Sequence, residues 1–334
     1  MQLCALPGVS SWEDAVRDAI KERAERYADE VRTDPLGNLI VWKKGKKAAP
    51  IRLLLAAHMD EVGLMVRKIT DERYLKFDPV GSVDRRGLIG KPVRVGEKGL
   101  PGVIGLKAYH LVDKQEEKSV PKLESFYLDI GAKDRSEAEK LAAPGDAVVF
   151  STLPELFGEN LLKAKALESR VGCAVLLKLL EEELPVDCTF AFTAQKEVGA
   201  RGAFGTGFSV KPDVALVLDG AAAMDIPGAP ASAGSCRLGK GAVITYMDHG
   251  AIADAGLFDT LRTLAQANEI PWQIQASGAD RGDATALQRA GCGVRTAFLS
   301  VPVRYPKSPA AVAHLGDMEA VLRLSRAFLA HMGQ

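Results

Sequence analysis

The chain has 334 residues, of which 47% are hydrophobic and 26% charged, a composition typical of soluble globular proteins with one large domain or two of ordinary size. Lysine plus arginine and aspartate plus glutamate both number 43, so the formal net charge is zero and nothing indicates nucleic acid or an anionic membrane surface as a partner. No apolar run approaches the roughly 18 residues of a membrane helix, and residues 1–10 lack signal-peptide architecture. The five cysteines are dispersed along the chain, which favours reduced thiols and a cytoplasmic location.

The first predicted helix begins with a capping box, in which Ser10 is the N-cap and Glu13 stands three positions later. We expect this helix to run to about Glu30. A turn at residues 35–38 then leads to a short predicted strand, Leu39–Trp42.

A continuous apolar run, Leu53–Ala57, is typical of a strand buried on both faces. It ends in His58, Met59, Asp60 and Glu61. Because side chains alternate along an extended chain, His58 and Asp60 point to the same side. A histidine whose second N–H group is accepted by a carboxylate is a common form of oriented metal ligand. The same residues are also compatible with an ordinary polar strand end.

Residues 66–150 have a different pattern, because short β-type segments alternate with turns rich in glycine, proline and charge. Helical periodicity is found only near residues 136–142. The pattern is typical of a small closed or barrel-like β module, which we interpret as a domain inserted into the other one. The expected strands are Tyr74–Phe77, Pro92–Val95, Gly102–Gly105 and Phe126–Ile130.

From residue 161 onward, strands and helices alternate again, which predicts a mostly parallel sheet with helices on both faces. The predicted fold class is therefore α/β with an inserted β-barrel-like domain. Residues 1–65 and 156–334 would form the α/β domain and residues 66–155 the insertion. The expected strands are Cys188–Ala194, Val214–Leu218, Ala242–Met247, Trp272–Gln275 and Arg295–Val301; the expected helices are Ser169–Glu183, Gly256–Asn268, Asp283–Ala290 and Asp317–Met332.

Several ionisable side chains follow the predicted strands or precede the predicted helices. In open α/β sheets, sites form beyond the carboxyl ends of the strands, so we expect these side chains to converge. Each one alone has an ordinary explanation, such as a charge at a helix N-terminus. Carboxylates gathered in a partly dry crevice nevertheless need cations, whether metal ions or ammonium groups. The set is His58, Asp60, Glu168, Lys196, Glu197, Asp219 and Lys307.

Five motifs in order along the chain resemble those of the tetrahedral aminopeptidases, which are glutamyl or deblocking metalloaminopeptidases. The resemblance covers essentially the whole chain. The motifs are AAHMDEVGLMV from residue 56, KALESRVG from 165, TAQKEVGARGA from 193, DVALVLDG from 213 with DIPG at 225–228, and VPVRYPKSP from 301.

The resemblance implies a catalytic domain that binds two divalent ions, usually zinc, cobalt or manganese. It also implies that the inserted domain drives dimerisation and that dimers commonly build a hollow dodecamer. Carried onto this sequence, it implies that His58 ligates one metal and that Asp60 orients His58. Glu197 and Asp219 would be terminal ligands.

Three departures from the family pattern affect the chemistry. Glu168 stands where the family has a bridging aspartate, Lys196 where it has the glutamate base, and Lys307 where it has a histidine ligand. The family's Gly-Thr-Asp-Ala stretch appears as Gly278–Arg281. A protonated lysine is neither a ligand nor a base, and neighbouring acids raise its pKa, whereas two-metal hydrolysis needs both a complete ligand set and a base.

We therefore hypothesise that Lys196 and Lys307 stand in for the two metal ions, which would be absent or reduced. The protein would then be a non-catalytic subunit, in a homo-oligomer or in a mixed oligomer with active paralogues. Other interpretations remain open: the lysines point to solvent while a shifted neighbour keeps the metals; the chain is an active aminopeptidase with an altered metal site that removes N-terminal residues from short peptides; or it is a module that binds a peptide or a small anion.

Overall fold

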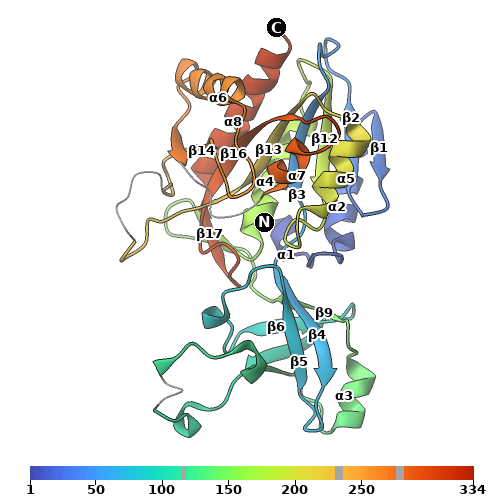
Figure 1. Ribbon diagram of the computed structural model, residues 1–334, viewed down its shortest axis with the longest axis vertical. Coiled ribbons are helices and arrows are strands. Elements are labelled where there is room, and N and C mark those ends of the chain that lie inside the picture. The colour runs from blue at the N-terminus through green and yellow to red at the C-terminus, as the bar shows by residue number, and fades with distance from the viewer. Residues whose placement is uncertain (115–117, 230–235, 276–281) are drawn as a thin grey trace.

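The computed structural model describes residues 1–114, 118–229, 236–275 and 282–334. An α/β domain and a closed β-barrel make up the molecule, with the barrel below the α/β domain in Figure 1. The predicted fold class is confirmed. The helices are α1 (Gln2–Ala5), α2 (Asp14–Ala24), α3 (Arg135–Leu141), α4 (Leu167–Leu180), α5 (Arg201–Val210), α6 (Ala255–Ala267), α7 (Asp283–Gln288) and α8 (Leu315–Met332), with short 3-10 turns η1 (Arg85–Gly87), η2 (Tyr109–Leu111) and η4 (Leu123–Ser125) in the barrel.

The sheet of the α/β domain is mixed. Its central strands run parallel in the order β12-β3-β13-β16. The flanking strands pair antiparallel, except that β15 pairs parallel with β14. The strands of this sheet are β1 (Glu30–Thr33), β2 (Leu39–Lys43), β3 (Leu53–His58), β10 (Glu155–Phe157), β11 (Leu161–Ala164), β12 (Cys188–Thr193), β13 (Val214–Ala222), β14 (Ala242–Thr245), β15 (Trp272–Gln275), β16 (Arg295–Arg304) and β17 (Ala311–His314).

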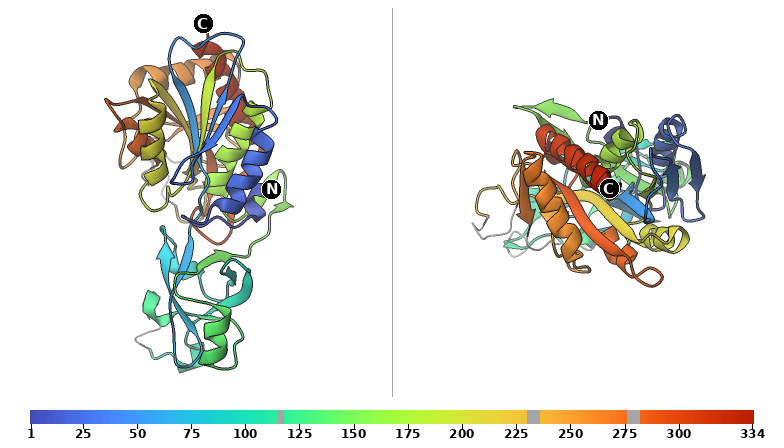
Figure 2. Two further views of the ribbon diagram at one scale, coloured as in Figure 1. Left: turned by 90° about the vertical axis from the view of Figure 1, so that its right-hand side faces the viewer. Right: turned by 90° about the horizontal axis from the view of Figure 1, so that it is seen from above.

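Strand β3 lies at the centre of the parallel block, and all six of its residues are buried. Alternate side chains of β3 pack into two different core layers. Leu53 and Leu55 pack in the core that includes residues of α2, α4, α6 and α8, whereas Leu54 and Ala56 pack in the one that includes residues of α5 and α7. Helices therefore cover both faces, as the views in Figure 2 show, and this explains the unbroken apolar run.

The barrel closes in the order β4-β5-β8-β7-β6-β9 and has its own apolar core. The chain enters it at Gly63, five residues after β3 ends, so the insertion begins beside the ends of the parallel strands. Its strands are β4 (Gly63–Ile69), β5 (Leu75–Val80), β6 (Pro92–Val95), β7 (Leu100–Gly105), β8 (Tyr127–Asp129) and β9 (Ala147–Phe150).

The first helix differs from its prediction. It spans Asp14–Ala24 with Glu13 as N-cap, and Glu30, the predicted end of the helix, is the first residue of strand β1, where it pairs with Trp42. Ser10 is not the cap, because its hydroxyl donates to Asp60 instead. Long-range pairing thus overrides the local helix signals.

Helix α5 and strands β10, β11 and β17 were not predicted. The sequence of α5, RGAFGTGFSV, contains three glycines, which lower helix propensity. Gly202 and Gly207 lie in this helix because Cβ atoms there would approach Ala194 backbone and the Ala290 side chain within 3 Å. Close packing, not propensity, selects this helix.

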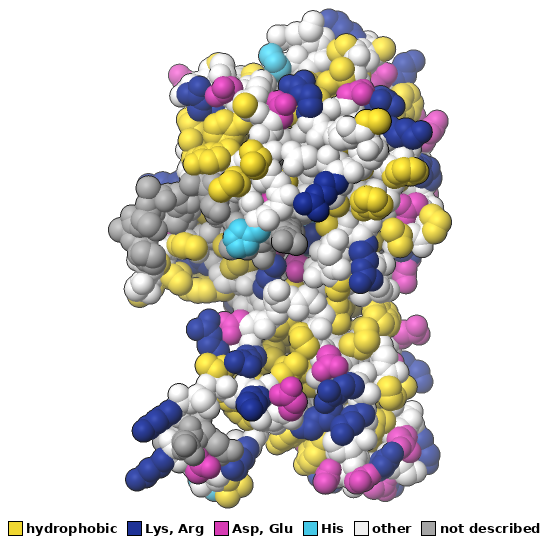
Figure 3. All heavy atoms as spheres, viewed as in Figure 1, with side chains coloured by type: hydrophobic (Ala, Val, Ile, Leu, Met, Phe, Trp, Pro, Cys, Tyr) yellow, Lys and Arg dark blue, Asp and Glu magenta, His cyan; other side chains and the backbone are white. Residues whose placement is uncertain are grey.

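Within the described residues, none of the helices has both the length and the apolar character needed to cross a bilayer. All five cysteines are free thiols, four of them buried and Cys292 exposed. On the face in Figure 3, basic and acidic side chains are mixed over both domains.

Candidate active site

The parallel register brings three strand ends together. His58 is the last residue of β3 and lies opposite Thr193, the last residue of β12, while β13 pairs with β3 on the other side and continues to Ala222. The Met59 N–H donates to the Thr193 carbonyl at 2.7 Å, which joins the two chains beyond the strands. Residues that follow these strands therefore share one edge of the sheet.

Glu168 reaches the same edge from the first turn of α4. The helix approaches β13 closely at Gly220, where a Cβ atom would lie 2.7 Å from the Glu168 Cα. Ala166, the residue before α4, has a left-handed backbone with φ 58°. The turn into α4 and the glycine opposite it together place the Glu168 carboxyl group beside Asp219.

Asp60 is fully buried and organises the loop after β12. Its Oδ1 accepts the Lys196 N–H and its Oδ2 accepts the Glu197 N–H, both at 2.9 Å. The Ser10 hydroxyl donates to Oδ2 at 2.6 Å. The residue before this pair, Gln195, has φ 58°, so the chain turns sharply as it leaves the strand. The loop is held by the carboxylate rather than by regular structure.

Lys196 lies in the middle of the carboxylates. Its Nζ is 3.0 Å from Glu168 Oε1, 3.5 Å from Asp219 Oδ2 and 3.6 Å from Glu197 Oε1, and only 2% of its side chain is exposed. Burial by itself would lower the Lys196 pKa, but the carboxylates of Asp219, Glu168 and Glu197 outweigh it and raise this pKa well above its usual value. Lys196 is therefore a buried ammonium group.

His58 bridges two carboxylates. Its Nδ1 lies 3.1 Å from Asp60 Oδ1 and its Nε2 lies 3.2 Å from Asp219 Oδ1. Burial and Lys196 would lower the His58 pKa, but the two aspartates raise it to about 10. An imidazolium donates from both ring nitrogens, and here each of them faces a carboxylate oxygen.

The pKa values of the carboxyl groups are shifted by the same neighbours. Burial would raise the Asp60 pKa, but His58, Ser10 and the backbone donors lower it to about 2. The Asp219 pKa is also lowered, since Lys196 and His58 outweigh burial. Burial raises the pKa of Glu168, although Lys196 opposes this. Charge in the cluster is thus balanced between cationic side chains and carboxylates.

Lys307 closes the cluster on its more open side. Its Nζ lies 3.6 Å from Glu197 Oε2, and 15% of its side chain is exposed. The residue has a left-handed backbone, with φ 59°, and so does Tyr305, with φ 54°. Non-glycine residues rarely adopt this conformation, and such strain is concentrated at functional sites.

All the side chains predicted to converge do so: His58, Asp60, Glu168, Lys196, Glu197, Asp219 and Lys307 form one connected set of contacts shorter than 4 Å. The alternative in which Lys196 points to solvent is wrong, because its ammonium group is buried inside the set. Gly278–Arg281 lies outside the described residues.

The donor set does not fit two divalent ions in this arrangement. The Lys196 ammonium group lies between the carboxylates of Glu168, Glu197 and Asp219, where a metal ion bound by them would lie. His58 contacts Asp60 and Asp219 through its two ring nitrogens. In the described part of the chain, no group of three or more histidine, cysteine, aspartate or glutamate side chains is placed to hold a metal ion.

Sequence reasoning missed the roles of two supporting residues. Ser10 was interpreted as a helix cap, yet it binds Asp60. Asp283 is buried and accepts a hydrogen bond from the Thr193 hydroxyl; burial raises the Asp283 pKa to about 6, although the charge of His58 opposes this. No short-range signal identifies these residues, because their partners are distant in the sequence.

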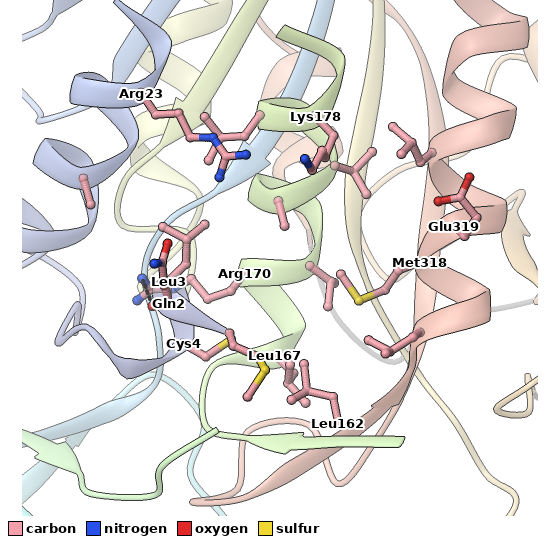
Figure 4. Close-up of a pocket in the computed structure, with 18 of the residues that line it drawn as sticks. Gln2, Leu3, Cys4, Arg23, Leu162, Leu167, Arg170, Lys178, Met318 and Glu319 are labelled. Atoms are coloured by element: carbon pink, nitrogen blue, oxygen red, sulfur yellow. Dashed lines mark hydrogen bonds between the residues drawn. The ribbon is translucent and has the colours of Figure 1, made fainter. Parts of the chain in front are cut away.

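Two cavities differ in character. A cavity of about 60 Å³ adjoins Lys196 and Asp219. A larger one, of about 600 Å³, lies between α1, α4 and α8, away from the cluster, and Figure 4 shows its mostly apolar lining, including Leu162, Leu167 and Met318. Of the cluster, Glu168, Lys196 and Asp219 line the smaller cavity. His58, Asp60, Glu197 and Lys307 line a separate cavity of about 20 Å³.

Comparisons with known proteins agree on one family. Residues 37–324 match the model of the M42 glutamyl aminopeptidases. The lysyl aminopeptidase of Pyrococcus furiosus is 32% identical over 97% of this chain and 93% of its own. An aminopeptidase structure from the archaeon Desulfurococcus kamchatkensis superposes with a TM-score of 0.93 at 34% identity, covering 99% of this chain and 93% of its own. The TET1 peptidase of Pyrococcus horikoshii, described as able to assemble into a tetrahedron or a large octahedral shell, has a TM-score of 0.86 at 35% identity, covering 98% of this chain and 97% of its own.

Proposed function

Because the chain belongs to the M42 glutamyl aminopeptidase family, we propose that it is a metalloaminopeptidase homologue that has lost, or nearly lost, two-metal peptide hydrolysis. In this proposal it acts as a non-catalytic subunit of an oligomer. Bound metal would be absent or reduced compared with active relatives.

The observation that carries the proposal is the position of the Lys196 ammonium group. Its contacts with Glu168, Glu197 and Asp219 supply positive charge at the centre of the cluster. Without a cation there, buried carboxylates would repel one another and lose their solvation. A divalent ion would have to displace a buried ammonium group that already balances the same carboxylates.

The general base is also missing. The resemblance assigns the base to position 196, where a protonated lysine has no lone pair to accept the proton of a water molecule. Lys307 stands at a family ligand position and contacts Glu197 through its ammonium group. Two independent requirements of the reaction are therefore unmet, and this favours loss of activity over an altered metal site.

The subunit role rests on the family likeness. The Pyrococcus horikoshii relative assembles into closed shells, and the barrel of this chain corresponds in place to the domain from which the resemblance predicts dimerisation. We propose a homo-oligomer built from such dimers, up to a dodecamer, or a mixed oligomer with active paralogues. Size-exclusion chromatography with light scattering measures the first, and co-purification measures the second.

The decisive experiment combines metal content with activity. Protein purified without chelator is analysed by plasma mass spectrometry and assayed on a panel of aminoacyl chromogenic substrates with zinc, cobalt or manganese. The double reversion Lys196→Glu, Lys307→His restores the family residues at these two positions and leaves Glu168 unchanged. We expect little metal and no turnover for the wild type, and an activity at least about 100-fold higher in the revertant, the lower range of what a general base contributes.

A matched control is Lys98→Glu with Lys240→His, which makes the same chemical changes at two exposed lysines. It should leave metal content and activity unchanged. Two tightly bound ions per wild-type chain, with turnover abolished by chelator, would instead establish the working aminopeptidase with an altered site.

A further inference from the structure

The cavity of about 600 Å³ between α1, α4 and α8 has no residue in common with the lysine–carboxylate cluster. Its wall is built mainly from aliphatic side chains of these three helices and of β11, as Figure 4 shows. A cavity of this size and character is typical of sites for small organic molecules, which are mostly apolar with a few polar groups. The apolar lining includes Leu3, Leu162, Leu167, Val175, Met318 and Leu322.

Most of the charged side chains in this lining are basic. Three of them are exposed and already contact glutamates, whereas Arg170 is buried, with only 1% of its side chain exposed. In Figure 4, Arg170 extends from α4 toward Leu3 of α1, at the inner end of the cavity. The exposed basic side chains are Arg23, Lys178 and Arg326, and Glu319 is the acidic one among the described residues of the lining.

Arg170 has an incomplete set of partners. Its Nη1 donates to the Leu3 carbonyl at 3.3 Å, but its Nε and Nη2 make no hydrogen bond within the described residues. Its Nη2 lies 3.6 Å from Glu61 Oε1, and the Lys165 ammonium group contacts the same oxygen at 2.6 Å. Burial raises the pKa of the Cys4 thiol, although Arg170 opposes this, so Cys4 adds no negative charge. Two buried cations therefore share one carboxylate.

Buried charges are normally paired, so an unmatched guanidinium group beside a cavity indicates an anionic guest. We propose that the cavity binds an amphipathic carboxylate, which is an aliphatic chain that ends in one carboxyl group. The chain would fill the space between α4 and α8, and the carboxylate would lie against Arg170, because a guanidinium group pairs well with a carboxylate.

Access to Arg170 depends on α1, which is a single turn of four residues, Gln2–Ala5, without a side-chain cap. A small displacement of Leu3 would release Nη1 and open the guanidinium group to the cavity. The aliphatic wall offers few partners for a second polar group, which favours a simple carboxylate over a sugar or a nucleotide. No cluster residue takes part, so this binding is independent of peptide hydrolysis.

The test compares sodium octanoate with 1-octanol by isothermal titration calorimetry of the oligomer as purified, at pH 7.5. The two ligands have the same aliphatic chain length, so the comparison isolates the carboxylate. We expect octanoate to bind at least about tenfold more tightly, as hydrogen bonds to a charged group provide. Equal affinity of the two ligands, or no binding of octanoate at about 10 mM, would overturn the proposal.

Two variants assign the parts of the ligand to the structure. Arg170→Gln should weaken octanoate binding about tenfold and leave 1-octanol binding unchanged. Ala174→Phe places a ring in the cavity from α4 and should abolish binding of both ligands. Lys178→Gln is the matched control, since it replaces an exposed basic side chain of the same lining, and it should change octanoate affinity by less than about twofold. An equal loss in Lys178→Gln and Arg170→Gln would contradict the assignment to Arg170.

Circular dichroism melting identifies any variant that fails to fold. If Arg170→Gln unfolds, the octanoate preference of the wild type and its loss in Ala174→Phe decide. Light scattering excludes a different occupant: Ala174→Phe should keep the oligomer mass of the wild type. A smaller mass would show that a second copy of the chain fills the cavity, and this would overturn the proposal.

Discussion

The Ser10 hydroxyl donates a hydrogen bond of 2.6 Å to Oδ2 of Asp60, a residue 50 positions later in the chain. The same carboxylate accepts the backbone N–H groups of Lys196 and Glu197 and lies against the ring of His58. One buried aspartate thus connects the N-terminal segment, the end of β3 and the loop after β12. Stability and the geometry of the cluster depend on the same group.

Ser10→Ala should destabilise the protein by roughly 1.5–3 kcal/mol, the range for losing a buried hydrogen bond to a charged group. The measurement is chemical denaturation monitored by fluorescence. Ser209→Ala, which removes an exposed serine hydroxyl, is the control and should cost less than about 0.5 kcal/mol. Equal effects of the two substitutions would mean that the Ser10–Asp60 bond contributes nothing specific.

Lys196→Met should be strongly destabilising, by about 3–5 kcal/mol, because it leaves Glu168, Glu197 and Asp219 without their shared cation. Lys163→Met removes a comparable side chain from its exposed pair with Glu155 and should cost less than about 1 kcal/mol. Denaturant melts of the two variants provide the comparison. A small effect at Lys196 would show that the carboxylates do not need its charge.

Thr206→Val should stabilise the protein by roughly 1 kcal/mol. The Thr206 hydroxyl is buried in α5 and has no hydrogen-bond partner in the described structure, so folding leaves a polar group unpaired. Valine has almost the same shape without that cost. A lower melting temperature for the variant would indicate that the hydroxyl has a partner, such as an ordered water.

Glu13 should make stability fall as the pH rises from about 5 to 8. Burial, with the nearby charge of Asp60, raises the Glu13 pKa from 4.5 to about 7. The folded state therefore holds a proton that the unfolded chain releases above pH 4.5, so the stabilisation is complete below that pH and is lost as the pH rises through 7. In Glu13→Gln this part of the slope, roughly 2–3 kcal/mol in total, should disappear. Urea melts of both proteins across this range isolate it, since all other titrating groups are common to both; parallel curves would rule it out.

Chelator should leave the melting temperature of the wild type unchanged, because ammonium groups already balance the buried carboxylates. The revertant Lys196→Glu, Lys307→His should behave in the opposite way, gaining stability with added zinc by mass action. Differential scanning fluorimetry with and without chelator measures both. A drop in the wild-type melting temperature would reveal a bound ion that contributes to folding.

Local pattern was sufficient for several elements. The unbroken apolar run before His58 indicates a strand buried on both faces, because both of its faces meet helices. The helical periodicity of apolar residues also identifies α4, α6 and α8. The change after residue 66 to short β-type segments separated by turns identifies the barrel. These features depend on interactions between near neighbours, or on burial alone, so they are visible in the chain itself.

The motifs in order, together with the rule that sites form at strand ends, were enough to identify the converging side chains. What they left open was the direction of Lys196, whose ammonium group could have pointed to solvent. That direction is decided by Asp60, which accepts the backbone N–H groups of Lys196 and Glu197, and by carboxylates contributed from α4 and β13.

Only the tertiary structure decided the rest, for one physical reason: the partners are far apart in the chain. Ser10 was expected to cap a helix and binds Asp60. Helix α5 was not predicted, and its glycines allow its close packing. The raised pKa of His58 follows from two aspartates, one of which comes from another strand. The residue types of the site were determined by the sequence, but their charges, contacts and adjoining cavity arise only when β3, β12, β13 and α4 meet.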